Sequence, residues 1–166
     1  AIDDIRQISS GLHPYQLEQL GLAKAVESMV NQISRNNELT INVSLAAIDR
    51  RFSSESEILL FRIIQEALNN ILKHAQATEV QITAIAAGDS IELNVIDDGR
   101  GFAKPADELL ESGNHGLGLR ELVERARQLD GIIEFLHRRQ SGTILRLMIP
   151  ISTMNKDMER STDDEQ

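Results

Sequence analysis

The sequence predicts an α/β domain, on the basis of three observations. Three segments after Pro14 repeat apolar residues at helical spacing, and five shorter segments alternate apolar residues with polar or small ones. The chain has 166 residues, of which 41% are apolar. A chain of this length can bury about 70% of its surface on folding, which is enough for one hydrophobic core. We therefore expect a single domain.

The composition excludes several classes of protein. The chain carries 17 Lys and Arg against 26 Asp and Glu, a net charge of −9, and it has no Cys. Disulfides and thiolate zinc sites are therefore excluded. An acidic chain with 3% aromatic residues makes a poor nucleic-acid binder. The sequence has no long apolar run and no secretion signal, so we expect a cytoplasmic domain, although this does not decide whether a longer parent is membrane-anchored.

The first residues predict a helix with an exposed apolar stripe. Ile2, Ile5, Ile8 and Leu12 recur at helical spacing before Pro14. The helix has no capping residue at Ala1. We therefore expect it to be the end of a longer stem, whose stripe packs against a partner helix in the parent.

Three further helices are predicted, at residues 22–35, 54–75 and 119–129. Ser53 or Ser54 can cap the second of them, and Glu57 stands three residues after Ser54, as in a capping box. Gly131 suits the left-handed position that ends the third. The second helix is the longest, and it carries the first group of chemically interesting side chains.

Five strands are predicted, at residues 39–47, 80–86, 91–97, 133–135 and 143–149. Gly88-Asp89 is expected to join the second and third as a hairpin, and Ser141-Gly142 to turn between the last two. The Gly-rich segment 99–118 is too long for an ordinary connection and is expected to be a mobile lid. Acidic residues with little apolar content predict a disordered tail over residues 153–166.

Four short segments carry the chemistry, and the first lies on the longest helix. Glu66, Asn70 and Lys73 are spaced i, i+4 and i+7 and should share one face. A carboxylate, an amide oxygen and an ammonium on one stripe can hold a hydrated divalent cation and contact phosphate. On spacing alone, a solvated polar face is the simpler interpretation.

The second segment is Asp97-Asp98-Gly99-Arg100-Gly101, at the end of a strand. Asp97 has the parity of the apolar residues before it and should point to the core, whereas Asp98 should point away. A buried carboxylate needs a donor, and the exocyclic amine of a purine would be one. Gly99 and Gly101 would let the backbone approach such a ring. The alternative is an ordinary strand-end turn.

The remaining two segments are weak signals when taken singly. Gly116 and Gly118 open the third helix, where free amide groups can meet phosphate oxygens. Thr143 has the parity of Leu145, which places its hydroxyl on the same inner face as Asp97.

The order and spacing of the four segments along the chain together form a specific signature. The four segments resemble, in sequence order, the N box, G1 box, G2 box and G3 box of the ATPase family shared by gyrase, Hsp90, histidine kinases and MutL. Residues 65–75 and 97–102 look like sensor histidine kinases of the nitrate-sensor and DesK-like branch. Leu12-His13-Pro14 and Leu20-Gly21-Leu22 resemble the link between dimerisation region and catalytic domain in that branch. The resemblance covers roughly residues 2–150.

The resemblance implies a fold and a function. The fold would be a two-layer α/β sandwich, in which one mixed sheet of about five strands is covered on one face by about three helices. Residues 1–21 would be the remnant of a helical stem and its linker, and residues 22–152 the ATP-binding domain. The domain would transfer the γ-phosphoryl group of Mg²⁺-bound ATP to a histidine on a dimerisation helix. Its partners would be a second copy of the parent, joined through that stem, and the receiver domain of a response regulator.

Roles for individual residues also follow from the resemblance. Asp97 would accept a hydrogen bond from the adenine amino group. Asn70 would ligate Mg²⁺, and Glu66 would orient the metal or act as a base. Gly116 and Gly118 would hinge the lid. The full set of implied nucleotide-binding residues is Asn70, Lys73, His74, Asp97, Gly99, Gly101, Gly116, Leu117, Gly118, Leu119 and Thr143.

One departure from the family pattern concerns activity. In this branch the phosphorylated histidine follows an Arg-Glu-Leu run on the first dimerisation helix, and no such run occurs in the sequence. His13 lies in the linking segment, which is not the acceptor in the family, and His137 reads as a surface residue. We therefore expect the chain to bind ATP without autophosphorylating.

Two other functions stay open. A serine kinase that acts on an anti-sigma-factor antagonist has a similar ATP site, but the Leu-His-Pro segment argues against it. A non-catalytic nucleotide-sensing module is the other, and the presence of Asp97, Asn70 and Glu66 argues against that one.

Overall fold

The structure is a computed structural model that describes residues 14–48, 51–102, 104–111 and 117–153. Three predicted features lie outside this range: the helix at residues 2–12, the lid residue Gly116, and the tail after Thr153. None of the helices within the described ranges is long and apolar enough to cross a membrane.

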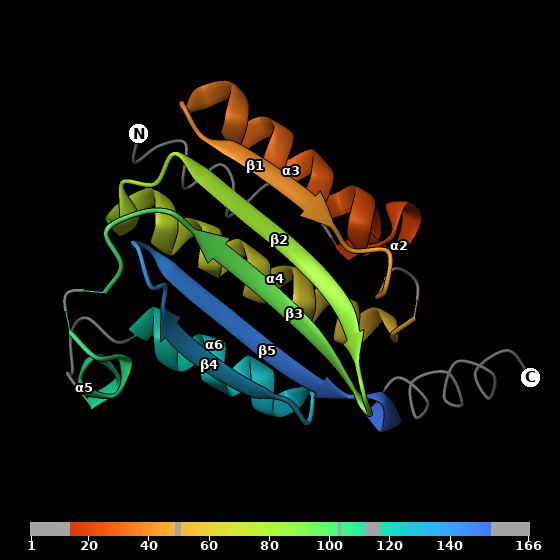
Figure 1. Ribbon diagram of the computed structural model, residues 1–166. Coiled ribbons are helices and arrows are strands. Elements are labelled where there is room, and N and C mark those ends of the chain that lie inside the picture. Colours follow the sequence, from red (N-terminus) through yellow and green to blue (C-terminus); the bar gives the residue numbers. More distant parts are fainter. Residues whose placement is uncertain (1–13, 49–50, 103, 112–116, 154–166) are drawn as a thin grey trace, which may run out of the picture.

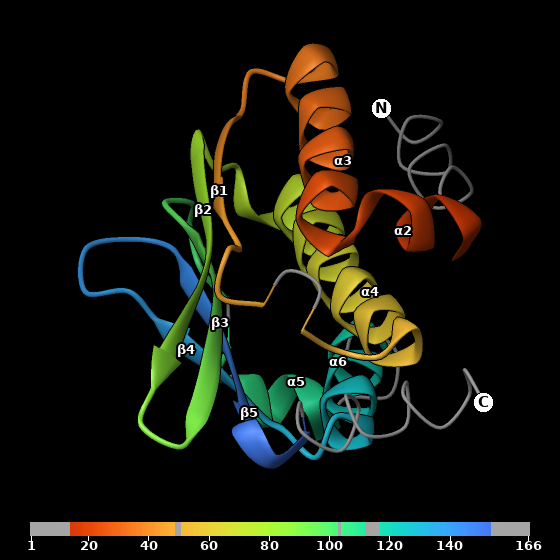
Figure 2. The same ribbon diagram turned by 90° about the vertical axis from the view of Figure 1, so that its right-hand side faces the viewer.

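The molecule has two layers, a mixed sheet and a set of helices on one of its faces (Figures 1 and 2). The strands are β1 Thr40–Ser44, β2 Glu79–Ala87, β3 Ser90–Asp97, β4 Ile132–His137 and β5 Thr143–Pro150, in the spatial order β1-β2-β3-β5-β4. The β1–β2 pair is parallel, and the other three pairs are antiparallel. The sandwich that the sequence predicts is confirmed.

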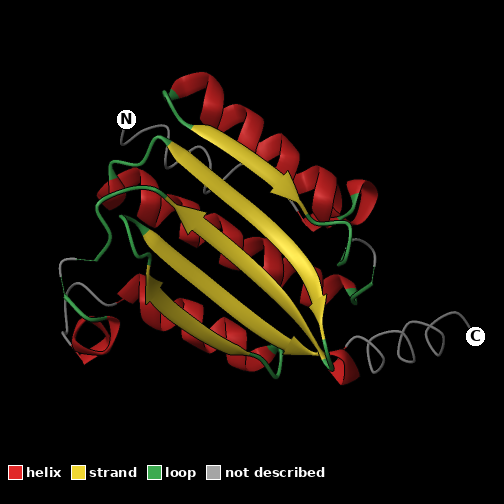
Figure 3. Ribbon diagram, in the orientation of Figure 1, coloured by secondary structure: helices red, strands yellow, loops and turns green. Residues whose placement is uncertain are grey.

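The helices are α2 Pro14–Leu20, α3 Leu22–Asn36, α4 Ser54–Asn70, α5 Ala106–Glu111 and α6 Leu117–Gln128 (Figure 3). A π-helical turn, η1 Ile71–Ala75, continues α4 without a break. Helices α3, α4 and α6 cover the sheet (Figure 2). Their inner faces and the facing strands form one core, in which Leu60, Ile64 and Leu93 are fully buried. Each such side chain contributes about 1.5 to 3 kcal/mol by leaving water.

The predicted element ends need two corrections, at Pro14 and at Thr153, and one prediction between them is confirmed. Pro14 begins helix α2 within the predicted linker, because the first helical position needs no N–H. The cap of α4 is Ser53, one of the two predicted candidates, and its Oγ accepts from the Ser56 N–H at 3.2 Å. Glu57 therefore stands four residues after the cap, not three. Thr153 is buried and donates to the Leu129 carbonyl at 3.4 Å, so the folded part includes this residue of the predicted tail.

The end of α6 also differs from the prediction. Asp130, with φ of 53°, takes the left-handed position that was expected of Gly131. Gly131 serves a packing role instead, because a Cβ there would lie 2.9 Å from the Met148 carbonyl oxygen. A helix stop signal in sequence therefore identified the right place and the wrong residue.

The connections place the site at one end of the sheet. The two-residue turn Gly88-Asp89 joins β2 to β3, as predicted, and the register pairs Val80 with Asp97. The segment between β3 and α6, predicted to be a lid, contains the short helix α5. The end of β3 lies between the start of β2 and the start of β5, so three segments far apart in sequence meet there (Figure 1).

Candidate functional site

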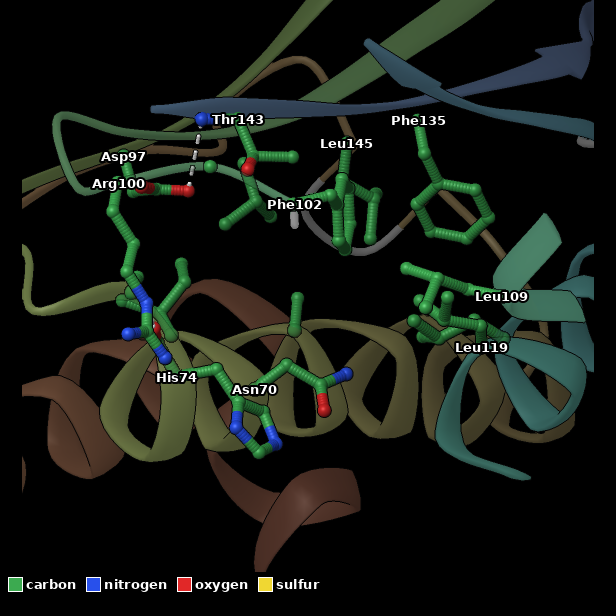
Figure 4. Close-up of a pocket in the computed structure, with 16 residues that line it drawn as sticks. Asn70, His74, Asp97, Arg100, Phe102, Leu109, Leu119, Phe135, Thr143 and Leu145 are labelled. Carbon is green, nitrogen blue, oxygen red and sulfur yellow. Dashed lines mark hydrogen bonds between the residues drawn. The ribbon is translucent and has the colours of Figure 1, made fainter. Parts of the chain in front are cut away.

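A cavity of about 260 Å³ lies between the end of α4 and the end of β3 (Figure 4). Most of its lining is apolar, with a few polar groups, which is the usual composition of a small-molecule site. Its lining residues are Ala67, Asn70, Ile71, His74 and Ala75 from α4 and η1, Val95, Asp97, Phe135, Thr143 and Leu145 from the sheet, Arg100, Gly101 and Phe102 from the following loop, and Leu109, Leu119 and Leu122 from α5 and α6.

Asp97 is the buried acid of the cavity, with 2% of its surface exposed. Its Oδ1 accepts from the Gly99 N–H at 2.8 Å, and its Oδ2 accepts from the Thr143 N–H at 3.2 Å. Burial raises the pKa of Asp97, and these two backbone donors oppose the rise. Each carboxylate oxygen can accept more than one hydrogen bond, so a ligand amine could still donate to Asp97.

Asp98 has a separate structural role, as strand alternation predicts. It accepts from the Thr78 N–H at 2.8 Å, from the Thr78 hydroxyl at 2.6 Å and from the Glu79 N–H at 2.9 Å. The Thr78 hydroxyl is the main cause that lowers the pKa of Asp98. Asp98 thus fixes the start of β2 to the end of β3, while Asp97 faces the cavity.

Asn70 and Glu66 lie next to each other on α4, near the beginning of α6. Asn70 is half-buried and lines the cavity, whereas Glu66 is half-buried beside it and is not in the lining. A Cβ on Gly118 would lie 2.5 Å from Glu66 Oε1 and 3.6 Å from Asn70 Nδ2. The absence of a side chain at Gly118 therefore lets α6 approach both polar groups.

Lys73 and His74 differ in position although they are adjacent. Both side chains are exposed, but only His74 lines the cavity. They belong to η1, and a π-helix takes more residues per turn than an α-helix. His74 is four residues after Asn70 and lies on the same side of the helix, whereas Lys73 lies outside the lining.

Close backbone packing joins the loop after β3 to its neighbours. A Cβ on Gly99 would overlap the Ala75 carbonyl oxygen, and one on Gly142 would overlap the Asp97 carbonyl oxygen. Gly142 also has φ of 103°, which side chains rarely allow. The Ser141 hydroxyl donates to the Gly99 carbonyl in the same place. The predicted Gly101 lines the cavity directly.

Helices α5 and α6 close the side of the cavity away from Asp97. Leu119, predicted from the sequence, is buried there and faces Leu109 of α5 (Figure 4). Arg120 Nε donates to the Leu110 carbonyl at 2.8 Å and ties α5 to α6. Leu117 begins α6, but its side chain is not among those described, and Gly116 lies outside the described residues.

Sequence reasoning missed several lining residues, among them Arg100, Leu109 and two aromatic rings. Phe102 and Phe135 meet edge to face with centroids 6.1 Å apart, and Phe102 meets the His137 ring in the same way at 6.2 Å. His137 is exposed, as predicted, yet it borders the cavity wall. Arg100 and Phe102 stand inside the motif at residues 97–102, which was the signal available in the sequence for these two.

The polar groups fit a magnesium ion that is shared with a substrate. Asn70 and Glu66 bring a side-chain amide and a carboxylate to one place beside Gly118. Within the described ranges, no three His, Cys, Asp or Glu side chains gather closely enough to hold a metal by themselves. Magnesium suits such a site, because it accepts one or two protein oxygens and completes its shell with water and phosphate oxygens.

The comparisons with known proteins agree with this geometry. The chain is 34% identical over 151 residues to the oxygen sensor histidine kinase NreB of Staphylococcus carnosus. The match covers 91% of the chain and 42% of NreB, so the chain spans less than half the length of this relative.

Two solved structures share the fold. The histidine kinase domain of the blue-light activated kinase of Erythrobacter litoralis EL346 has a TM-score of 0.66 and 24% identity, and the match covers 82% of this chain and 64% of that one. The ATP binding domain of PrrB from Mycobacterium tuberculosis has a TM-score of 0.57 and 23% identity, with 78% of this chain and 93% of that one covered.

A family model gives the assignment. The model described as histidine kinase-, DNA gyrase B-, and HSP90-like ATPase matches residues 55–153, which is more than half of the chain and includes α4, β3, α6 and β5. From its fold, its cavity and this match, the chain belongs to the histidine kinase-, DNA gyrase B- and HSP90-like ATPase family.

Proposed function

We propose that the chain is the ATP-binding catalytic domain of a two-component sensor histidine kinase. The observation that carries the proposal is the buried Asp97 carboxylate, which faces a largely apolar cavity at the end of β3. Family membership and the 34% identity to a sensor histidine kinase support it. We place the ATP-binding domain at residues 22–152, with the linker before it and the acidic tail after it, on the cytoplasmic side.

The base would bind at the Asp97 end of the cavity. The carboxylate accepts from the adenine amino group, and Thr143 contacts the ring through its hydroxyl or a water. The apolar side chains of Val95, Leu145 and Phe102 give the ring a dry surface. An acceptor-only carboxylate favours a base with an amine at this position over one with a carbonyl.

The triphosphate would extend from the base toward α4 and the start of α6. Asn70 and Glu66 would hold the magnesium ion, which neutralises charge that develops on the transferred phosphoryl group. Lys73 and His74 would approach the phosphates from η1. Gly116, Leu117, Gly118 and Leu119 would form the hinge and edge of the lid above them.

In phosphoryl transfer, the domain mainly has to position the reacting groups and stabilise the charge that develops on them. The γ-phosphoryl group leaves the β-phosphate oxygen and is taken up by an imidazole nitrogen of a histidine on a dimerisation helix. That helix would come from the stem of the parent dimer, and a receiver domain of a response regulator would then take the phosphoryl group.

The test is a transfer assay. The chain is mixed with γ-labelled ATP, Mg²⁺ and a separately produced dimerisation stem that carries an acceptor histidine, and phosphohistidine is identified by its stability in alkali and lability in acid. We expect label on the stem histidine and little on the chain itself. The Asp97→Asn variant, which should not bind ATP, is the control.

The other outcomes separate the remaining candidates. Label on a serine of an added anti-sigma-factor antagonist would indicate a serine kinase. ATP binding without transfer to either acceptor would indicate a nucleotide-sensing module. Either result would overturn the proposed histidine kinase function.

A further inference from the structure

We propose that Arg100 is a positioning residue of this site: it holds the π-helical turn η1 against the end of β3 and thereby presents the His74 side chain to the cavity. The inference rests on the proposed function in so far as the ligand is ATP. It adds Arg100 to the site and links it to His74, a coupling that neither the motif order nor the helical spacing predicts.

Arg100 donates hydrogen bonds to the carbonyl groups at the end of η1. The last carbonyl groups of a helix have no partner within it and need donors from elsewhere. Arg100 supplies two of them, since its backbone N–H donates to the Ala75 carbonyl at 2.8 Å and its Nε donates to the His74 carbonyl at 2.6 Å. A guanidinium is also favoured there because the carboxyl end of a helix carries partial negative charge.

Close contacts also join the end of η1 to the end of β3. Gly99 packs so closely on the Ala75 carbonyl that a Cβ would overlap it, and the Gly99 N–H donates to Asp97 Oδ1. The chain then leaves η1 through Gln76, which has φ of 52° in the left-handed region. The base-binding carboxylate and the helix end are therefore linked through residues 97–100.

The side chain that this arrangement presents to the cavity is that of His74. Within η1, Ile71, His74 and Ala75 line the cavity and Lys73 does not, so His74 is the polar side chain of η1 in the lining. A π-turn is less stable than an α-turn and is often found at functional sites. Here its terminal carbonyls are held by Arg100, whose side chain extends from the sheet end to the helix beside His74 (Figure 4). Loss of that anchor should let the turn relax and move His74.

A direct role of Arg100 is the competing explanation. Its guanidinium is exposed and lines the cavity, so it could itself contact the nucleotide. The two explanations differ in one respect. A positioning residue acts through the His74 side chain, so its effect should vanish when that side chain is absent, whereas a contact residue keeps its effect.

The experiment is a double-mutant cycle on the whole chain, with Arg100→Ala, His74→Ala and the double variant, and with MgATP affinity measured by calorimetry. We expect Arg100→Ala to weaken binding about tenfold and His74→Ala about fivefold, with Arg100→Ala adding less than about twofold in the His74→Ala background. Arg100→Lys, which retains one donor, should lose less than about threefold.

Two further measurements separate positioning from loss of structure. The imidazole proton signals of His74, assigned from the His74→Ala spectrum, should shift in ligand-free Arg100→Ala. Arg139→Ala removes the same charge from an exposed position outside the lining and should leave both affinity and those signals unchanged.

Three results would overturn the inference: unchanged affinity in Arg100→Ala, additive losses in the double variant, or unshifted His74 signals. Absence of ATP binding by the unaltered chain would instead refute the proposed function, so the two failures are distinguishable.

Discussion

Asp97 and Asp98 are adjacent acids with opposite surroundings, and the difference can be tested by one substitution at each. In Asp97→Asn, one carboxylate oxygen becomes an NH₂ group, which cannot accept from a ligand amine and confronts a backbone N–H. We expect ATP affinity to fall at least about a hundredfold, because the new NH₂ group and the donor that it faces are buried together without an acceptor. Calorimetric titration measures the loss.

The control is Asp98→Asn, which changes the same charge on the other face of the strand. It should weaken the Thr78 and Glu79 hydrogen bonds and lower thermal stability, while the folded protein keeps ATP affinity within about threefold. Equal affinities in the two variants and the unaltered chain would refute the assignment of Asp97 to the base.

The raised pKa of Asp97 has a consequence for pH dependence. Burial is the main cause of the rise, so the folded state holds this proton more tightly than the unfolded chain does. As pH falls through the raised pKa, protonation of Asp97 stabilises the free protein but removes the acceptor for the ligand. We expect ATP affinity to decline at a higher pH than an ordinary carboxyl would require. Affinity that stays constant through acidification would contradict this.

Asn70 is expected to act through magnesium. Replacement by alanine removes the amide oxygen from the cavity wall, so ATP binding should weaken about tenfold with Mg²⁺ present and less than about twofold with a chelator. Calorimetry under both conditions measures the difference. Asn42→Ala, an exposed position on β1, is the matched control and should bind normally. Equal losses with and without the ion would exclude a role in metal binding.

At the scale of residues, sequence reasoning found the polar part of the cavity and missed much of the apolar part. Asn70, Asp97 and Thr143 were identified because helical spacing, strand parity and motif order each constrain where a polar side chain points. Phe135 and Leu109 could not be identified in this way, because an apolar residue at a helix or strand position is equally consistent with the core. Only the packing of β4 and α5 brings them to the cavity.

At the scale of elements, the predicted helix from residue 54 to 75 has the right length, but its last turn is of another kind. Helical periodicity over five residues cannot separate a π-turn from an α-turn. The donors that stabilise this turn come from Arg100, far away in sequence. Helix α2 does not follow from the sequence pattern, because a proline that ends one helix is also a favourable first residue for the next.

The turn between β4 and β5 offers a test of element packing. Gly142→Ala meets two costs, a backbone at φ of 103° and an overlap with the Asp97 carbonyl oxygen. We expect the free energy of unfolding to fall by about 2 to 3 kcal/mol, measured by urea denaturation. Gly88→Ala meets only the first cost, because φ is 61° and nothing lies within 4 Å of its Cβ, so it should lose about 1 kcal/mol. Equal losses would show that the close approach to β3 does not matter.

At the scale of the whole molecule, ligand binding should appear as thermal stability. MgATP at about one hundred times its dissociation constant adds about 2.7 kcal/mol to the free energy of unfolding, and for a domain of this size that raises Tm by about 5 to 10 °C. GTP at equal concentration should give little shift, because its ring presents a carbonyl where Asp97 requires a donor. A shift of the same size with both nucleotides would contradict recognition of the base by Asp97.

The arrangement of the cavity along the chain sets a limit on how the protein can be divided. One wall comes from residues 67–75, before the Gly88-Asp89 turn of the β2–β3 hairpin, and the opposite wall comes from residues 95–145, after that turn. A cut at Gly88-Asp89 would leave Asn70 and His74 on one fragment and Asp97 and Thr143 on the other. Either piece alone holds half of a binding surface, so nucleotide capture by such a split chain would report the reassembly of its parts.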